Sequence, residues 1–171
     1  ISQWGHDFRP DHAKIGQYVE NANIGQVCGF TATATPLVRD DICTHLNRPD
    51  MAIFVTGFRR PNLSFKVVEC RSKVDKLRTI DTLSADPVPT IIYAATRKAV
   101  EEVAGTVKGA IGYHAGMDDA LRTQAQNHFM QDESPILVAT NAFGMGIDRK
   151  DIRRVIHFNV PGSLEAYYQE A

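Results

Sequence analysis

The sequence predicts an α/β fold built on a parallel sheet, and three observations support this class. Short apolar segments rich in β-branched residues alternate with longer stretches of helical periodicity through most of the 171-residue chain. Elements that alternate in this way form right-handed βαβ units. The segment 136–139 is apolar at every position, which is typical of a strand buried on both faces of a parallel sheet. The hydrophobic share of 43% and the charged share of 23% fit a globular domain.

The first part of the chain predicts two helices and two strands. Ile15, Tyr18 and Val19 fall at helical spacing, and Thr35 precedes Pro36 as an N-cap precedes the first helical residue. The expected elements are a helix over 11–22, a strand over 26–31, a helix over 36–47 and a strand over 51–55. Residues 57–62 contain Gly, Pro and two arginines, and we interpret them as a connection between two lobes.

The rest of the chain repeats this order more completely. Val74, Leu77, Ile80 and Leu83 mark one helix, and the segment 90–93 is a buried strand by composition. The expected elements are strands over 64–68, 90–93, 110–113, 135–139 and 154–158 and helices over 74–83, 97–107, 120–130 and 164–170.

Charge and cysteine content restrict the classes of function. The net charge of −1 gives no global basic field, so any nucleic-acid binding must come from a local patch. The three cysteines show no CxxC spacing, so we expect reduced thiols and neither a zinc site nor a disulfide framework. No stretch reaches the ~18 apolar residues of a membrane span, and no signal peptide is visible. Both ends look cut, so we expect an excerpt of a longer protein.

The segment 136–148 is the most informative part of the sequence. Its apolar strand is followed by Thr140 and Asn141, then by two glycines one residue apart, and it ends on Asp148. Ligands bind at the carboxyl edge of open α/β sheets, where Gly146 would allow close approach of a phosphate or sugar and Asp148 could accept from a ribose hydroxyl. The alternative is a strand followed by a glycine-rich turn. The complete string closely resembles motif V of the RecQ family of DNA helicases.

Two segments in the first part of the chain also resemble this family. Residues 2–10 resemble the aromatic-rich loop that senses single-stranded DNA, which implies that Trp4, Phe8 and Arg9 contact DNA; the alternative is a Trp that anchors the loop to the core. Residues 30–35 resemble motif III, which implies that Thr31 and Thr33 couple the nucleotide and nucleic-acid sites; the alternative is a simple helix cap.

Three more segments extend the resemblance. Residues 90–97 resemble motif IV, which implies that Arg97, at a helix start, contacts the DNA backbone, as Thr140 and Asn141 of motif V would. The alternative is a capped helix with a solvated Arg. Residues 113–117 match the family's YHAG sequence, so His114 could donate to a DNA phosphate or serve as a structural hydrogen-bonding group. Residues 167–171 resemble the start of motif VI, which implies a coupling role for Gln169. The basic residues of 149–154 form either a solvated face or a backbone-neutralising patch.

The resemblance implies two RecA-like lobes of the P-loop NTPase type, the first of them incomplete. Residues 1–58 would be the end of lobe 1 and residues 59–171 lobe 2. The intact protein would be an ATP-dependent helicase that uses ATP and Mg²⁺, moves 3′ to 5′ on single-stranded DNA and unwinds duplex DNA. Cytoplasmic localisation would be expected in a bacterium and nuclear localisation in a eukaryote.

The chain contains neither a G-x-x-x-x-G-K-[ST] sequence nor a D-E-x-H sequence, so we expect it to be inactive by itself and assign it no metal ligands. Two alternatives remain. One is a non-catalytic nucleic-acid-binding module, and the other is a DEAD-box-type RNA helicase, against which the sequences of residues 31–35 and 142–146 argue.

Overall fold

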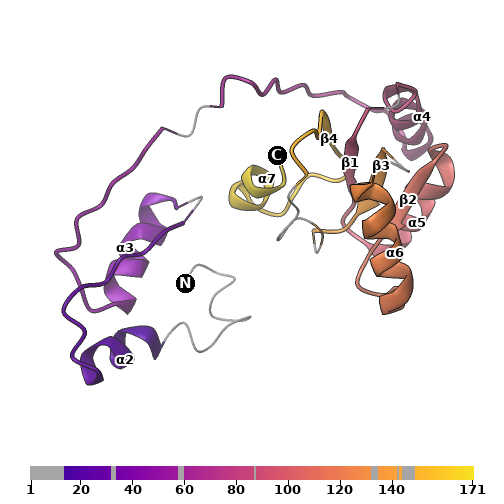
Figure 1. The fold of residues 1–171 in the computed structure, drawn as a ribbon. Helices are drawn as coiled ribbons and strands as arrows, with labels where there is room; N and C mark the ends of the chain where they lie inside the picture. The colour runs from indigo at the N-terminus through magenta and orange to yellow at the C-terminus, as the bar shows by residue number, and fades with distance from the viewer. Residues whose placement is uncertain are drawn as a thin grey trace. The chain divides into compact units, whose positions relative to one another are not determined.

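The structure is a computed structural model that describes residues 14–31, 34–57, 60–86, 88–131, 135–141, 143 and 149–171 (Figure 1). The chain divides into two compact units, Ile1–Phe65 and Lys66–Ala171. Trp4, Phe8, Arg9, Thr33, Gly146 and Asp148 lie outside the described residues. None of the described helices is both long and apolar enough for a membrane crossing.

The described part of the first unit contains two helices, α2 (Ile15–Asn21) and α3 (Pro36–His45). As predicted, Thr35 caps α3: its hydroxyl accepts a hydrogen bond from the Val38 amide at 3.4 Å, and Pro36 occupies the first turn. The close approach of α2 to the end of α3 depends on Gly16. A Cβ atom there would lie 2.1 Å from the carbonyl oxygen of His45.

The second unit is a parallel α/β domain, as predicted. Its strands are β1 (Thr90–Tyr93), β2 (Ala110–Tyr113), β3 (Ile136–Ala139) and β4 (Arg154–His157), and its helices are α4 (Lys73–Leu83), α5 (Arg97–Thr106), α6 (Asp119–Met130) and α7 (Leu164–Glu170). The strands form one sheet in the order β2-β3-β1-β4, and every neighbouring pair is parallel (Figure 1). In this register Tyr93 lies beside both Ala139 and His157, and Tyr113 lies beside Ala139, so the four strands end at one level.

Both faces of this sheet are buried, and period-two alternation sends successive side chains to different cores. Ile92 and Val138 pack on one face with Val100 and Val103 of α5. Ile91 and Leu137 belong to the other core together with Phe129 of α6. All four residues of β1 and of β3 are buried, because these are the two central strands of the sheet. Helices on both faces leave the strand ends as the place where polar groups can gather.

The predicted strands over 26–31, 51–55 and 64–68 are wrong, because these residues are irregular in the structure. A strand requires a hydrogen-bonded neighbour, and in the part of the chain that the structure describes none of the three segments belongs to a sheet. Their apolar side chains are accordingly exposed: Phe30 is 96% exposed, Phe54 91% and Val67 91%. The three segments have the composition of strands, but among the described residues they have no neighbouring strand with which to pair.

Candidate nucleic-acid interface

The carboxyl edge of the sheet carries most of the predicted site residues that the structure describes. Thr96 and Arg97 follow β1, His114 follows β2, and Thr140 and Asn141 follow β3. Because the four strands end at one level, these residues come to the same edge of the second unit. Such an edge, beyond the carboxyl ends of parallel strands, is where open α/β sheets bind ligands.

Arg97 is the first residue of α5 and is exposed. The hydroxyl of Thr96 accepts a hydrogen bond from the Ala99 amide at 3.2 Å and so fixes the helix start. Amides of the first helical turn have no partner within the helix and create a local preference for anions. A phosphate at this place would therefore be favoured both by the positive charge of the exposed Arg97 guanidinium and by the free amides at the start of α5.

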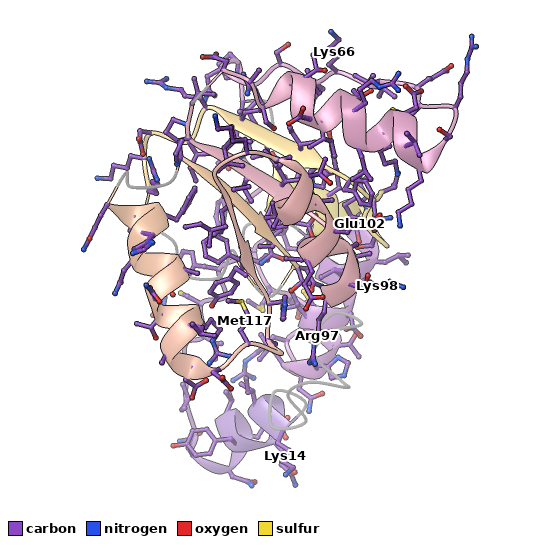
Figure 2. The ribbon with its side chains drawn as sticks, turned by 90° about the vertical axis from the view of Figure 1, so that its right-hand side faces the viewer. Lys14, Lys66, Arg97, Lys98, Glu102 and Met117 are labelled. Atoms are coloured by element: carbon purple, nitrogen blue, oxygen red, sulfur yellow. The ribbon has the colours of Figure 1, made fainter. Side chains whose placement is uncertain are left out.

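Arg97 also lies across the loop after β2. A Cβ atom at Gly116 would lie 2.8 Å from Nη1 of Arg97 and 2.9 Å from its Cδ. Figure 2 labels Arg97 at the start of α5 and Met117, the residue that follows Gly116. Glycine at this position allows the arginine side chain to cross the loop, so the motif IV segment and the YHAG segment form a single surface.

His114 is held inside this loop and is largely buried. Its Nδ1 accepts a hydrogen bond from the Gly116 amide at 3.2 Å, so the proton of the neutral ring is on Nε2, which lies 3.4 Å from a carboxylate oxygen of Glu101. The Met117 amide donates to the His114 carbonyl at 3.1 Å and closes a four-residue turn. Both ring nitrogens are therefore engaged within the protein, which favours the structural alternative for His114.

Thr140 and Asn141 begin the loop after β3. Thr140 is 9% exposed, and its carbonyl accepts from the Phe143 amide at 3.0 Å, whereas Asn141 is exposed. The ring of Phe143 packs edge-to-face on Tyr113, with 4.7 Å between the ring centroids. A buried aromatic anchor thus holds the start of the loop and leaves the Asn141 amide accessible.

Arg149 corrects the prediction for the basic run over 149–154. It is only 8% exposed, so at this position the run is neither a solvated face nor a patch available to DNA. Its guanidinium donates to both carboxylate oxygens of Asp151, at 2.9 and 3.2 Å, and to the carbonyl oxygen of Phe129. The hydrogen bond from Arg149 lowers the pKa of Asp151. Arg149 is a structural anchor between α6 and the segment before β4.

Gln169 is exposed on α7, next to a largely half-buried group of ionisable and aromatic residues. Nε2 of His157 lies 3.0 Å from Oε2 of Glu170, and its ring stacks on Tyr93. Burial raises the pKa of Glu170, lowers the pKa of His157 and, together with the charge of Glu170, raises the pKa of Tyr93 to about 12. This group attaches α7 to β1 and β4. Thr31, the other described coupling residue, is exposed in the first unit.

Sequence reasoning missed the partners that shape this edge. Glu101 faces His114, Gly116 accommodates Arg97, and Asn159 accepts a hydrogen bond from the Ala95 amide at 3.1 Å. The glycine of the YHAG segment carried a detectable signal, because glycine after a strand often marks close approach of another group. The roles of Glu101 and Asn159 arise from contacts between distant segments. Among the described residues, no three His, Cys, Asp or Glu side chains are grouped as metal ligands.

The family model and the sequence relatives that match this chain all belong to helicases. Residues 72–171 match the model of the helicase conserved C-terminal domain. The chain is 42% identical to the ATP-dependent DNA helicase RecQ of Bacillus subtilis, with 100% of this chain and 30% of the relative covered. It is 39% identical to the bifunctional 3′-5′ exonuclease/ATP-dependent helicase WRN of Mus musculus, with 99% of this chain and 13% of the relative covered.

The solved structures support the fold. S. cerevisiae Dbp5 bound to RNA and ADP BeF3 aligns with a TM-score of 0.71 over 82% of this chain and 39% of that chain. At 19% sequence identity, this likeness concerns architecture alone. The chain spans about a third or less of the length of the two sequence relatives named above.

Proposed function

This chain belongs to the helicase conserved C-terminal domain family, and from that premise we propose that it is part of a RecQ-type, ATP-dependent DNA helicase whose second unit binds the DNA backbone. The whole enzyme would couple ATP hydrolysis to 3′-to-5′ movement on single-stranded DNA and to unwinding of duplex DNA. The observation that carries the proposal is the contact between Arg97 and Gly116, which joins two loops of the carboxyl edge around an exposed cation.

We assign the described residues different roles at this edge. Arg97 would pair with a phosphate, and Asn141 would donate to a phosphate oxygen or a sugar. Thr140 would present its backbone at the start of the motif V loop. His114 would act as a positioning residue, since its ring keeps Gly116 and the turn in place beneath Arg97.

The nucleotide and coupling assignments rest on family resemblance. Gly146 and Asp148 would lie on the nucleotide side, and Thr31, Thr33 and Gln169 would couple that side to DNA. ATP and Mg²⁺ do not fit this chain alone, because the sequence has no P-loop and the described residues contain no group of metal ligands. We therefore derive no step of phosphoryl transfer and expect no ATP hydrolysis by the isolated chain, since such catalysis depends on positioned phosphate and metal ligands.

The direct test is binding of a labelled single-stranded oligonucleotide to the chain, measured by fluorescence anisotropy over a range of salt. Arg97→Ala should weaken binding and lower the salt slope by about 0.7, the value for one lost phosphate contact on a single strand. Lys108→Ala is the matched control, because Lys108 is exposed before β2, at the opposite edge of the sheet. Equal affinity of wild type and Arg97→Ala would refute the proposed site, and stronger binding of RNA than of DNA would favour the DEAD-box-type alternative.

The aromatic-rich loop is tested in the longer protein. If Trp4 senses DNA, Trp4→Ala should melt like wild type and still bind DNA, but lose most DNA-stimulated ATP hydrolysis. Loss of one stacked base removes only ~1–3 kcal/mol of binding, so some affinity should remain. If Trp4 is instead a core anchor, the same variant should melt early, because truncation of a buried Trp costs about 3–5 kcal/mol.

A further inference from the structure

A second basic feature lies beside the proposed DNA edge. A hollow of about 540 Å³ opens between the starts of α4 and α5 and the end of β4. Its charged lining consists of four cationic side chains and one carboxylate: Arg71, Lys73, Lys76, Lys98 and Glu102. The formal charge of this lining is +3, in a chain whose net charge is −1. A local excess of this kind is the footprint expected of an anion site.

Two of the four cations are used within the protein. Nζ of Lys73 lies 2.6 Å from Oε2 of Glu102. Nζ of Lys76 donates to the Phe158 carbonyl at 2.6 Å and sits 4.6 Å from the centroid of the Phe158 ring. These contacts hold Lys73 and Lys76 in place and leave Glu102 neutralised by a partner.

The other two cations are available to a ligand. Among the described residues, neither Arg71 nor Lys98 forms an ion pair, and both are exposed. The Asn159 side chain also lines the hollow; its Oδ1 accepts from the Ala95 amide, which leaves its NH₂ group as a neutral donor. Figure 2 shows Lys98 next to Arg97 on α5, with Glu102 one turn further along the helix.

The helix starts add fixed donors to this cationic lining. Ser72 caps α4 by accepting from the Asp75 amide at 3.1 Å, and Thr96 caps α5. Each cap satisfies one of the first-turn amides, so other amides of both helices remain as donors toward an anion. Thr96 and Lys98, the two sequence neighbours of Arg97, both line the hollow, so the hollow lies next to the place where Arg97 would hold a phosphate.

We propose that this hollow binds a second phosphate group of the DNA backbone, next to the phosphate held by Arg97, with Arg71, Lys98 and the amide of Asn159 as its ligands. The assignment rests on the proposed function of the carboxyl edge. The hollow extends the DNA path from the ends of β1 and β2 to the end of β4, and it recognises the backbone without reading bases, as a sequence-independent motor requires.

The test uses the 171-residue chain, a labelled single-stranded oligonucleotide and salt titrations. The salt slope is the steepness with which the logarithm of the binding constant falls with the logarithm of the salt concentration, and Lys98→Gln and Arg71→Gln should each lower it by about 0.7. Between 1 M and 0.1 M salt, each variant should therefore gain about fivefold less affinity than the wild type. Lys98→Arg should restore binding, and Lys108→Gln should change neither slope nor affinity. Thermal melting of each variant confirms that the fold is retained.

A second measurement separates the DNA backbone from a free anion. Amide chemical shifts of Thr96 and Lys98 are followed while either the oligonucleotide or inorganic phosphate is added. Shifts with the oligonucleotide together with the loss in Lys98→Gln support the proposal. Shifts with phosphate alone and unchanged DNA binding by the variants would make the hollow a small-anion site and overturn the proposal. DNA binding that depends on Arg97 but not on Lys98 or Arg71 overturns this inference only, whereas no DNA binding by the wild type overturns the proposed function as well.

Discussion

Replacing Gly116 with Ala should disturb the proposed DNA site while leaving the fold intact. The added Cβ would lie 2.8–3.0 Å from three side-chain atoms of Arg97, whereas unstrained carbon contacts are about 3.5–4.0 Å long. The guanidinium must therefore move by roughly 0.5–1 Å, and as the end of a flexible side chain it can do so cheaply. The left-handed backbone region is not required at Gly116, so alanine adopts the local conformation.

The expected change in stability is small, because two effects oppose each other. Displacement of Arg97 costs a fraction of a kcal/mol, and the lower entropy of the unfolded alanine chain contributes about 0.4–1 kcal/mol in the stabilising direction. We therefore expect a melting temperature within a few degrees of wild type, since about 1 kcal/mol corresponds to roughly 2–8 °C for domains of this size range. DNA affinity should fall to between the values for wild type and Arg97→Ala.

A double-mutant cycle shows whether the two residues act together. Single-stranded DNA affinity is measured by anisotropy for wild type, Gly116→Ala, Arg97→Ala and the double variant. If Gly116 acts through Arg97, the glycine substitution should have no further effect once Arg97 is absent. Additive losses in the cycle, or wild-type affinity of Gly116→Ala beside weak binding by Arg97→Ala, would refute this reasoning. A large drop in melting temperature would instead show that the turn itself cannot accept a Cβ atom.

Three further predictions follow from the packing. Gly16→Ala should destabilise the first unit by about 1–3 kcal/mol, because its Cβ meets the rigid backbone carbonyl of His45 at 2.1 Å; melting followed by circular dichroism measures this, and unchanged stability would contradict the close helix contact. Burial raises the pKa of Glu170, so its ionisation destabilises the fold as pH rises above the ordinary value; Glu170→Gln should therefore raise the melting temperature at pH 7 and have little effect near pH 4, and the reverse order would show a stabilising ion pair. Amides of Ile1–Phe65 should exchange faster than those of Lys66–Ala171, since the two hydrophobic cores formed by the described residues belong to the second unit, and equal protection would contradict this.

The sequence predicted the elements of the second unit well, because their signals are local. Thr96 and Arg97 marked a capped helix start, and the apolar segments of β1 and β3 were identified as buried strands. The segments over 26–31 and 51–55 carried the same kind of composition without forming strands. Strand formation depends on a neighbour far away in sequence, so composition can predict the capacity to form a strand but not its realisation.

The candidate site likewise contains some features that could be predicted from the sequence and others that could not. The place of Arg97, Thr140 and Asn141 at the carboxyl edge could be predicted, because polar residues directly after buried strands are visible in the sequence. Arg149 was misinterpreted because a run of basic residues does not reveal which member is buried; its partners Asp151 and Phe129 become evident only once α6 is placed. The Glu101 contact of His114 likewise joins α5 to the loop after β2 and has no counterpart in local spacing.

These contacts indicate why the proposed DNA-binding edge can be rigid although its residues come from separate loops. Each loop is attached to a capped helix or to a buried side chain: Thr96 fixes α5, Phe143 anchors the loop after β3, and His114 closes the turn after β2. Arg97 can lie across the neighbouring loop because Gly116 has no side chain at the point where the two meet. A phosphate site built in this way needs little reorganisation on binding, because its ligands are already positioned by packing rather than by the DNA. The exposed side chains can therefore be exchanged in binding tests without loss of the fold, whereas the residues that hold the loops cannot.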